Sequence, residues 1–321
     1  MRQSAKIMVA VATVLVIVGA AAFIIVMAAN KWKTDSIIST KMNSRTVEIT
    51  ESFKDISINT DTDKITFLSS DDGKCTLVFT ESEKEKHTAE VAGGVLTIGK
   101  TDTRNWYDHV TFFSGAPSVT VYLPRADHGA LTIEESTGDV DIPGDFTFES
   151  IDITASTGDV KCRASSGGSV KIDLSTGDIL AEDMRAGSMT LSVSTGHVDL
   201  RNVSCSGDAS VTVTTGKTRI EGLECRSFTS EGSTGDVTLK DAVASGKMII
   251  ERSTGDVKFD ACDADELDVS TDTGEVKGTL LSDKVFIVRS DTGDVDVPET
   301  TSGGVCRIST DTGDIKIEIE K

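Results

Sequence analysis

The sequence predicts an all-β protein: a single-span N-terminal helix, an irregular β cap, and a β-solenoid of about ten repeats of 19–20 residues. Three observations predict it. A Thr-Gly step recurs at nearly constant spacing, apolar residues keep the same positions around that glycine, and one long uncharged stretch lies near the N-terminus. The composition agrees, because 28 Gly and only 5% aromatic residues are typical of strands and turns.

The uncharged stretch runs from Ile7 to Ala29, which is 23 residues rich in Val, Ile, Ala and Met. At about 1.5 Å per residue, a helix of this length crosses a hydrocarbon core of roughly 30 Å. A cleaved signal peptide usually has a shorter apolar region, of roughly 7–15 residues. We therefore interpret residues 7–29 as a transmembrane signal-anchor, with a cleaved signal peptide as the alternative.

The segments around this stretch complete the predicted organisation. Residues 1–6 are expected in the cytoplasm and residues 30–43 form a linker. No second span of this kind follows in the sequence, so the remainder is expected outside the cytoplasm, in a cell membrane protein that crosses once.

The solenoid occupies residues 129–321, where the repeated glycine marks each repeat. Thr precedes every one of these glycines, and an acidic residue follows in eight of the ten, with His197 and Lys217 as the exceptions. The glycines are Gly138, Gly158, Gly177, Gly196, Gly216, Gly235, Gly255, Gly274, Gly293 and Gly313.

Apolar residues recur two and four positions after the glycine, and five and seven positions before it. A period of two on each side indicates strands with one buried face. Each repeat therefore reads as strand, Ser-Thr-Gly-Asp turn, strand and second turn. Parallel coils stacked at about 4.8 Å would align these residues in continuous columns. An antiparallel meander of hairpins is the alternative.

Residues 44–128 lack the period and contain shorter alternating runs, so we interpret them as an irregular β segment that caps the first coil. At the other end, residues 315–321 alternate apolar and charged residues. We interpret this last stretch as the edge strand of the array, protected by its charges.

The repeated Ser-Thr-Gly-Asp-Val motif follows a strand that ends in Val-Thr-Val-Tyr-Leu-Pro, from Val119 to Pro124, behind one N-terminal span. In these features the chain resembles the bacterial domain of unknown function 4097 family, β-strand-repeat proteins labelled "putative adhesin", over about residues 47–319. The resemblance implies an all-β solenoid in the cell envelope. It also permits envelope-stress sensing, which is linked to some relatives, and it carries over no catalytic residues.

The acidic residues of the last three turns are the candidate metal ligands. Oxygen ligands suit calcium, although the short Gly-rich repeat of calcium-binding rolls is absent. Turn geometry and solubility are the favoured interpretation, and a calcium site is the alternative; no other cofactor is expected. The residues are Asp272, Glu275, Asp291, Asp294, Asp311 and Asp314.

Two further groups of residues have candidate roles. The densest aromatic cluster contains Trp106, Tyr107, Phe112 and Phe113, residue types that occur at binding hot spots. Packing of the cap on the first coil is the other interpretation. Cys205 and Cys225 both lie nine positions after their glycine, so they should be neighbours in successive coils, either as core thiols or as a disulfide.

A net charge of −20 without a run of Lys or Arg argues against binding to nucleic acid. The four dispersed histidines form no recognisable catalytic motif. We therefore predict a non-catalytic scaffold, anchored in the membrane, for adhesion or contacts with envelope proteins or cell-surface polymers. An envelope-stress sensor that signals through partner membrane proteins is the first alternative, and a cell-wall glycan enzyme of the β-helix type is the second.

Overall fold

The computed structural model describes residues 3–29, 41–103 and 116–320. Its N-terminal element is helix α1, Gln3–Ala29. The part Val11–Ala29 has a mean hydropathy of 2.8 and is long and apolar enough to cross a membrane. Among the described residues it is the one helix of this kind, and a signal sequence would have the same properties.

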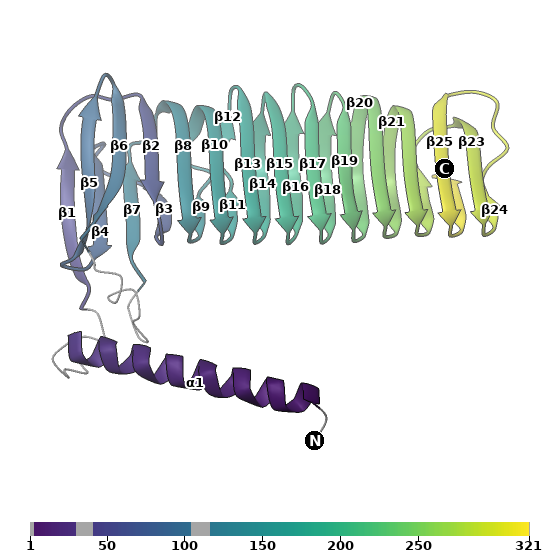
Figure 1. The fold of residues 1–321 in the computed structure, drawn as a ribbon. Helices are drawn as coiled ribbons and strands as arrows, with labels where there is room; N and C mark the ends of the chain where they lie inside the picture. Colours follow the sequence, from purple (N-terminus) through teal and green to yellow (C-terminus); the bar gives the residue numbers. More distant parts are fainter. Residues whose placement is uncertain (1–2, 30–40, 104–115, 321) are drawn as a thin grey trace.

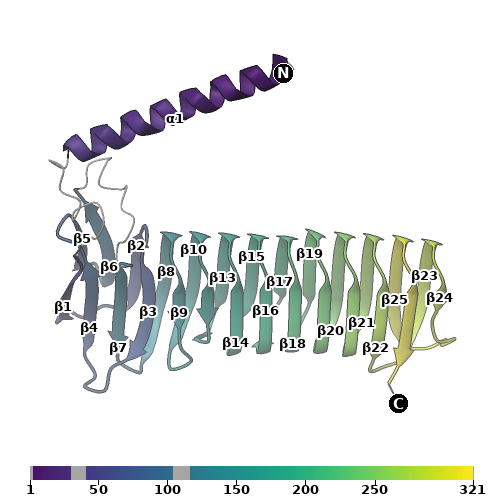
Figure 2. The same ribbon diagram turned by 90° about the horizontal axis from the view of Figure 1, so that it is seen from below.

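The repeats form a row of stacked coils (Figures 1 and 2). The strands before each Thr-Gly turn pair in parallel with one another and form the first stack. This stack contains β8 (Asp127–Thr137), β10 (Thr147–Thr157), β13 (Ser169–Thr176), β15 (Ser188–Thr195), β17 (Ala209–Thr215), β19 (Phe228–Thr234), β23 (Lys284–Thr292) and β25 (Gly304–Thr312).

The strands after each turn pair in parallel as a second stack. It contains β9 (Val140–Ile142), β11 (Val160–Cys162), β14 (Ile179–Ala186), β16 (Val198–Cys205), β18 (Thr218–Cys225), β22 (Val276–Leu280), β24 (Val295–Asp296) and β26 (Ile315–Ile319). The long strands β20 (Val237–Thr254) and β21 (Val257–Thr273) contribute to both stacks, and β12 (Ser165–Ser166) pairs beside β10. The predicted parallel solenoid is therefore confirmed, and the antiparallel meander is wrong.

Residues one repeat apart lie side by side, which produces the columns expected from the sequence. Leu131 pairs with Ile151, which pairs with Val170, and all three are buried. Leu200 and Phe259, four positions after their glycines, are also buried. Val295 departs from its column and is 45% exposed, because its coil lies at the end of the row.

The region expected to be an irregular cap contains one more coil. Strands β2 (Asp55–Thr60) and β3 (Lys64–Ser69) pair in parallel with β8 and β9, with Ile58 beside Ile133 and Ile65 beside Val140. We call residues 55–69 the lead coil. Its turn carries Asp63 where the later coils have glycine.

The remaining cap strands cover the lead coil. Strands β6 (Val95–Asp102) and β7 (Ser118–Leu123) pair in parallel with β2 and β3. Antiparallel partners follow: β5 (Glu85–Ala92) on β6, β4 (Cys75–Glu81) on β7, and β1 (Asn43–Ile49) on β4. The direction of pairing changes here, so the parallel stack ends at this point.

The last two coils are out of sequence order. Strands β25 and β26 pair with β21 and β22 on one side and with β23 and β24 on the other. The terminal coil is therefore β23 and β24, and the expectation that residues 315–321 form the edge strand is wrong. This order buries Ile315 and Ile317 between two coils. The buried Lys284 ammonium holds the start of β23 against Asp263 Oδ1 at 2.5 Å and the Ala264 carbonyl at 2.7 Å.

The buried columns predict the effect of truncating a core side chain. Leu200→Ala and Phe259→Ala should each lower the free energy of unfolding by about 2–5 kcal/mol, because each leaves a cavity in a packed column. Thr190→Ala, at an exposed position on β15, should change it little. Urea denaturation followed by circular dichroism measures these differences, and equal effects of all three substitutions would contradict the columns.

Candidate functional site

The Thr-Gly turns lie in line along one side of the solenoid, which we call the turn edge (the ten repeated glycines with the Thr before and the residue after each). Nine of these glycines have φ between +128° and +159°, where other residues are strained. A Cβ atom on Gly158 would lie 2.1 Å from the carbonyl oxygen of Gly138, and the same clash occurs from coil to coil. Close stacking therefore requires glycine.

Hydrogen bonds connect the turns along this edge. The Gly158 N–H donates to the Thr176 carbonyl of the next coil at 3.1 Å, and other glycines repeat this bond. The acidic residue after the glycine has its own contact. Asp139 Oδ1 accepts the Asp159 N–H at 3.1 Å, and Asp159 Oδ1 accepts the Asp178 N–H at 2.9 Å. The carboxylates therefore stabilise the stacking of successive turns.

The two exceptions to the acidic pattern take part in the same ladder. The His197 N–H donates to Asp178 Oδ1 at 2.7 Å, and His197 Nδ1 accepts the Lys217 N–H at 3.0 Å. Imidazole thus replaces carboxylate as the acceptor. The Lys217 ammonium lies 3.0 Å from the Asp236 carboxylate of the next coil and lowers the pKa of that carboxyl group.

The candidate calcium ligands lie at the C-terminal end of the turn edge. Asp314 Oδ1 accepts the Asp294 N–H at 2.9 Å, Asp291 pairs with Arg289 at 2.8 Å, and Glu275 pairs with Lys277. Asp272 and Asp311 are exposed. Within the described parts of the chain, no group of three or more His, Cys, Asp or Glu side chains could hold a metal ion. The calcium site stays a prediction.

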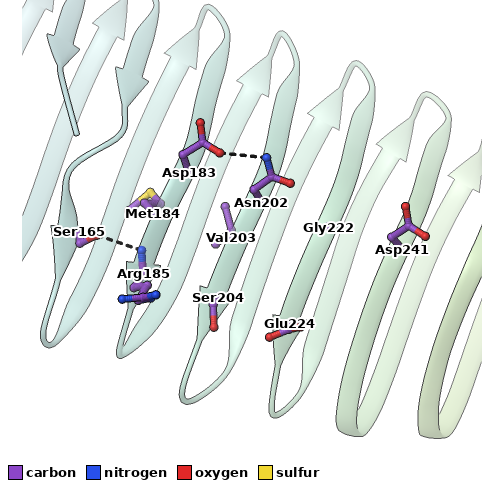
Figure 3. Close-up of a pocket in the computed structure, with 10 residues that line it drawn as sticks. All are labelled: Ser165, Asp183, Met184, Arg185, Asn202, Val203, Ser204, Gly222, Glu224 and Asp241. Atoms are coloured by element: carbon purple, nitrogen blue, oxygen red, sulfur yellow. Dashed lines mark hydrogen bonds between the residues drawn. The ribbon is translucent and has the colours of Figure 1, made fainter.

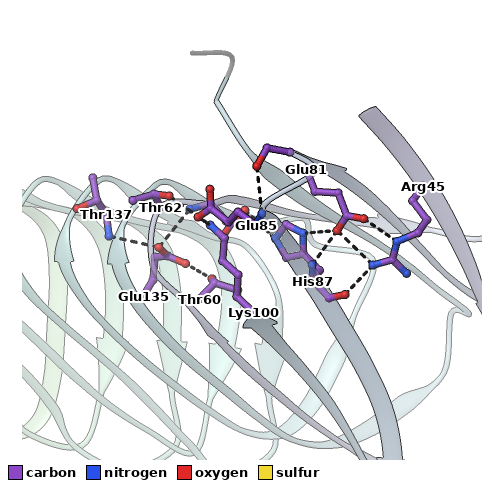
Figure 4. A network of polar contacts seen from close by, with 11 residues as sticks. Arg45, Thr60, Thr62, Glu81, Glu85, His87, Lys100, Glu135 and Thr137 are labelled. Carbon is purple, nitrogen blue, oxygen red and sulfur yellow. Dashed lines mark hydrogen bonds and ion pairs between the residues drawn. The ribbon is translucent and has the colours of Figure 1, made fainter. Parts of the chain in front are cut away.

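A buried ion network joins the cap to the lead coil (Figure 4). His87 lies between two carboxylates, with Nε2 at 2.9 Å from Asp63 Oδ1 and Nδ1 at 3.1 Å from Glu81 Oε2. Its ring stacks on Phe79 with centroids 4.8 Å apart. Lys100 bridges Asp63, at 3.0 Å, and Glu85. No repeat or spacing motif in the sequence marked these residues.

The charges in this network shift the pKa values of its carboxyl groups. Burial raises the pKa of Glu81, but hydrogen bonds from Arg45 and His87 outweigh it and lower the pKa to about 2. For Asp63, burial is likewise outweighed by His87 and Lys100, and its pKa falls below the ordinary value. Burial dominates at neighbouring Glu135, whose pKa is raised despite a hydrogen bond from Thr60.

A second polar group lies inside the solenoid. Thr218 and Ser230 break two apolar columns, and both hydroxyls accept hydrogen bonds from Arg252 Nη2, at 3.0 and 2.9 Å. Gly232 leaves room for this guanidinium, since a Cβ there would lie 2.7 Å from Nη1. Burial lowers the pKa of Arg252 to about 10. At these positions, hydrogen bonds to the guanidinium replace the apolar packing of the neighbouring coils.

A shallow hollow of about 630 Å³ lies along a bend within the strands of the second stack (Figure 3). The residues six positions after five of the repeated glycines bend there with positive φ, among them Asp183 (52°), Asn202 (51°) and Asp241 (50°). Asn202 Nδ2 donates to Asp183 Oδ1 at 2.9 Å. The lining of this hollow contains Ser, Asp, Asn, Arg and Glu but neither His nor Cys, so it offers polar contacts.

Of the other residues singled out in the sequence, the structure describes the two cysteines but not the aromatic cluster. Trp106, Tyr107, Phe112 and Phe113 lie outside the described residues. Cys205 and Cys225 are buried, lie in successive coils and are free thiols. Burial raises the pKa of Cys205 to about 11 and that of Cys225 to about 12, which disfavours the reactive thiolate.

The fold and the turn edge define the chain as a parallel β-solenoid. The Toastrack DUF4097 family matches residues 53–221 and 205–321, and the chain belongs to this family. The resemblance stated from the sequence is therefore confirmed.

Several solved structures resemble the chain at low identity. A "putative adhesin" from Parabacteroides distasonis has 13% identity and a TM-score of 0.50, covering 76% of this chain and 98% of its own. A "putative adhesin" from Bacteroides fragilis has 14% identity and a TM-score of 0.46, covering 88% and 100%. A "putative lipid binding protein" from Parabacteroides distasonis has 16% and 0.45, covering 75% and 96%. No curated protein matches the chain.

The ion network predicts a pH-dependent mutational effect. Arg45→Gln removes the Arg45 Nε bond to Glu81, at 2.7 Å, and should cost about 1–3 kcal/mol at pH 7. A carboxyl group with a depressed pKa stabilises the fold above its unfolded value of about 4.3, and this stabilisation is lost as pH falls through the folded value of about 2. The cost of Arg45→Gln should therefore shrink toward pH 2.

Arg226→Gln is the matched control, because Arg226 pairs with Asp208 at 2.6 Å where both side chains are more than half exposed. It should cost clearly less than Arg45→Gln, because water and salt screen an exposed pair. Denaturant unfolding at several pH values measures both variants. A cost of Arg45→Gln that stays constant down to pH 2 would contradict the assigned role of Glu81.

Proposed function

We propose that the chain is a non-catalytic scaffold, anchored by α1 with its solenoid outside the cytoplasm, that binds envelope proteins or cell-surface polymers along the turn edge. The observation that carries the proposal is a regular, exposed ladder of hydroxyl groups. The Thr before each repeated glycine pairs with the Thr of the next coil, as Thr176 does with Thr195 and Thr195 with Thr215. All ten of these Thr residues are exposed.

Repetition is what makes this edge suited to binding. Equivalent hydroxyl and carboxylate groups recur at the coil spacing of about 4.8 Å. The backbone beneath them is fixed by the glycine and Asp ladders, so little conformational entropy is lost when a partner binds. An extended partner, such as a polymer chain or a protein surface, can contact several coils at once, which raises affinity without a deep pocket.

The described histidines support the non-catalytic part of the proposal. His87 is enclosed by the ion network, His128 Nε2 lies 3.1 Å from the Pro124 carbonyl oxygen, and His197 is an acceptor in the turn ladder. Each has a structural partner. A glycan-cleaving site would instead need clustered carboxylates in a hollow with a raised pKa on one of them.

The family supports the envelope location. A solved structure with this fold is named "putative adhesin", and α1 supplies an element that can enter a membrane. A sensor role would use the same exposed edge. It differs in requiring that partner binding change the state of a second membrane protein.

The proposal predicts which face is captured on living cells. The full chain, treated on intact cells with a crosslinker that does not cross membranes, should form adducts with envelope proteins or polymers. Thr176→Lys, Thr195→Lys and Thr215→Lys combined should abolish them, because long charged side chains cover the turn edge.

The matched control places Lys at Thr190, Ser210 and Thr229, which face outward from β15, β17 and β19. This variant should keep the adducts. Adducts that form only after lysis would place the solenoid in the cytoplasm, and equal loss in both variants would show that the turn edge is not the binding surface.

A further inference from the structure

The terminal coil has an unpaired strand edge. Among the strands that the structure describes, β23 pairs only with β25 and β24 only with β26. In Figure 1 this coil lies at the opposite end of the row from β1 and β4. Strand edges of this kind carry free N–H and C=O groups and bind further strands unless they are protected.

This edge is apolar as well as unpaired. Outside α1, five large apolar side chains of the described residues are strongly exposed, and three of them belong to this end: Leu281 at 45%, Ile287 at 57% and Val295 at 45%. Strand β23 contains the run Val-Phe-Ile-Val from residue 285 and has no Pro. Charged residues flank this run, with the buried Lys284 before it and Arg289 and Asp291 after it, but the run itself carries neither charge nor Pro to protect the edge.

The direction of the free backbone groups follows from one hydrogen bond. The Thr292 carbonyl accepts the Gly313 N–H at 3.0 Å, so the backbone groups of Thr292 point toward β25. These groups alternate along a strand. Those of Arg289 and Asp291 therefore point to the unpaired edge.

We propose that β23 pairs with β23 of a second copy of this chain, antiparallel and in a register centred on Ser290. This register places Arg289 opposite Asp291 of the second copy, and Asp291 opposite Arg289 of the second copy. Both side chains are accessible, at 77% and 47%, and form a 2.8 Å pair within one chain. A register centred on Arg289 or Asp291 would place that residue opposite its own copy, which is unfavourable.

The symmetry of the contact limits its size. At the other end of the solenoid the parallel stack ends in antiparallel cap strands, of which β1 and β5 each pair on one side only among the described strands. A contact of β23 with one of these strands would be head-to-tail and would give assemblies larger than a dimer. An antiparallel contact of β23 with itself is isologous and closes as a dimer. The two N-terminal caps then lie at opposite ends of the dimer. This inference does not depend on the proposed function of the turn edge.

Reciprocal charge reversal tests the register. The full chain in detergent micelles is studied by sedimentation velocity over a concentration series, and the wild type should form a dimer. Arg289→Asp alone, or Asp291→Arg alone, faces like charges across the contact and should weaken dimerisation about tenfold or more. The double reversal restores opposite charges and should recover wild-type dimerisation.

Arg226→Asp reverses an exposed charge in the middle of the solenoid and should leave the dimer unchanged. A dimer formed through α1 would be unaffected by every one of these substitutions. A monomer at all concentrations would overturn the proposal. So would single reversals with no more effect than Arg226→Asp, or a double reversal as weak as the singles. Assemblies larger than a dimer would show a heterologous contact and equally contradict it.

Discussion

The solenoid depends on how closely successive turns approach at the repeated glycine. The glycine Cα lies against the carbonyl of the preceding turn, so that a Cβ on Gly177 would be 2.0 Å from the Gly158 oxygen. This approach fixes the register of the coils, and the register in turn aligns the apolar columns. It also brings each Asp side chain within reach of the next backbone N–H. The exposed Thr ladder is a further consequence of the same register.

The two ends of the stack show what happens where this constraint is released. At the lead coil, Asp63 occupies the glycine position, and its side chain is turned into the buried network with His87 and Lys100. That network holds the cap on the lead coil, so the cap strands cover the outer edge of the lead coil. At the other end the last coil in the sequence, β25 and β26, lies one position inside the terminal coil, so β23 is the outermost strand of the first stack. One end is thus closed by ion pairs and antiparallel strands, whereas the other keeps an apolar edge.

The sequence period was enough to predict the parallel coils and the burial of residues such as Leu200 and Phe259, because every repeat carries apolar residues at the same positions around its glycine. It did not reveal the lead coil, since Asp63 replaces the glycine that marks a turn. It could not order the last two coils either, because β23 and β25 fit the same columns and only their side-chain contacts distinguish the positions. The ion network was missed because Arg45, Glu81 and His87 come from three different cap strands, β1, β4 and β5, and no motif links them. The role of Asp139 and its equivalents as backbone acceptors required coordinates.

The measurement that tests the central claim most directly is the free energy of unfolding of Gly196→Ala against Gly167→Ala. Gly196 has φ +144° and a Cβ there would lie 1.9 Å from the Gly177 oxygen, whereas nothing lies within 4 Å of a Cβ on Gly167. Close stacking predicts a loss of at least about 2 kcal/mol for Gly196→Ala, from backbone strain and overpacking. Gly167→Ala should be neutral or stabilising by about 0.4–1 kcal/mol. Equal, small effects of the two substitutions would contradict the claim that the turn glycines set the register of the solenoid.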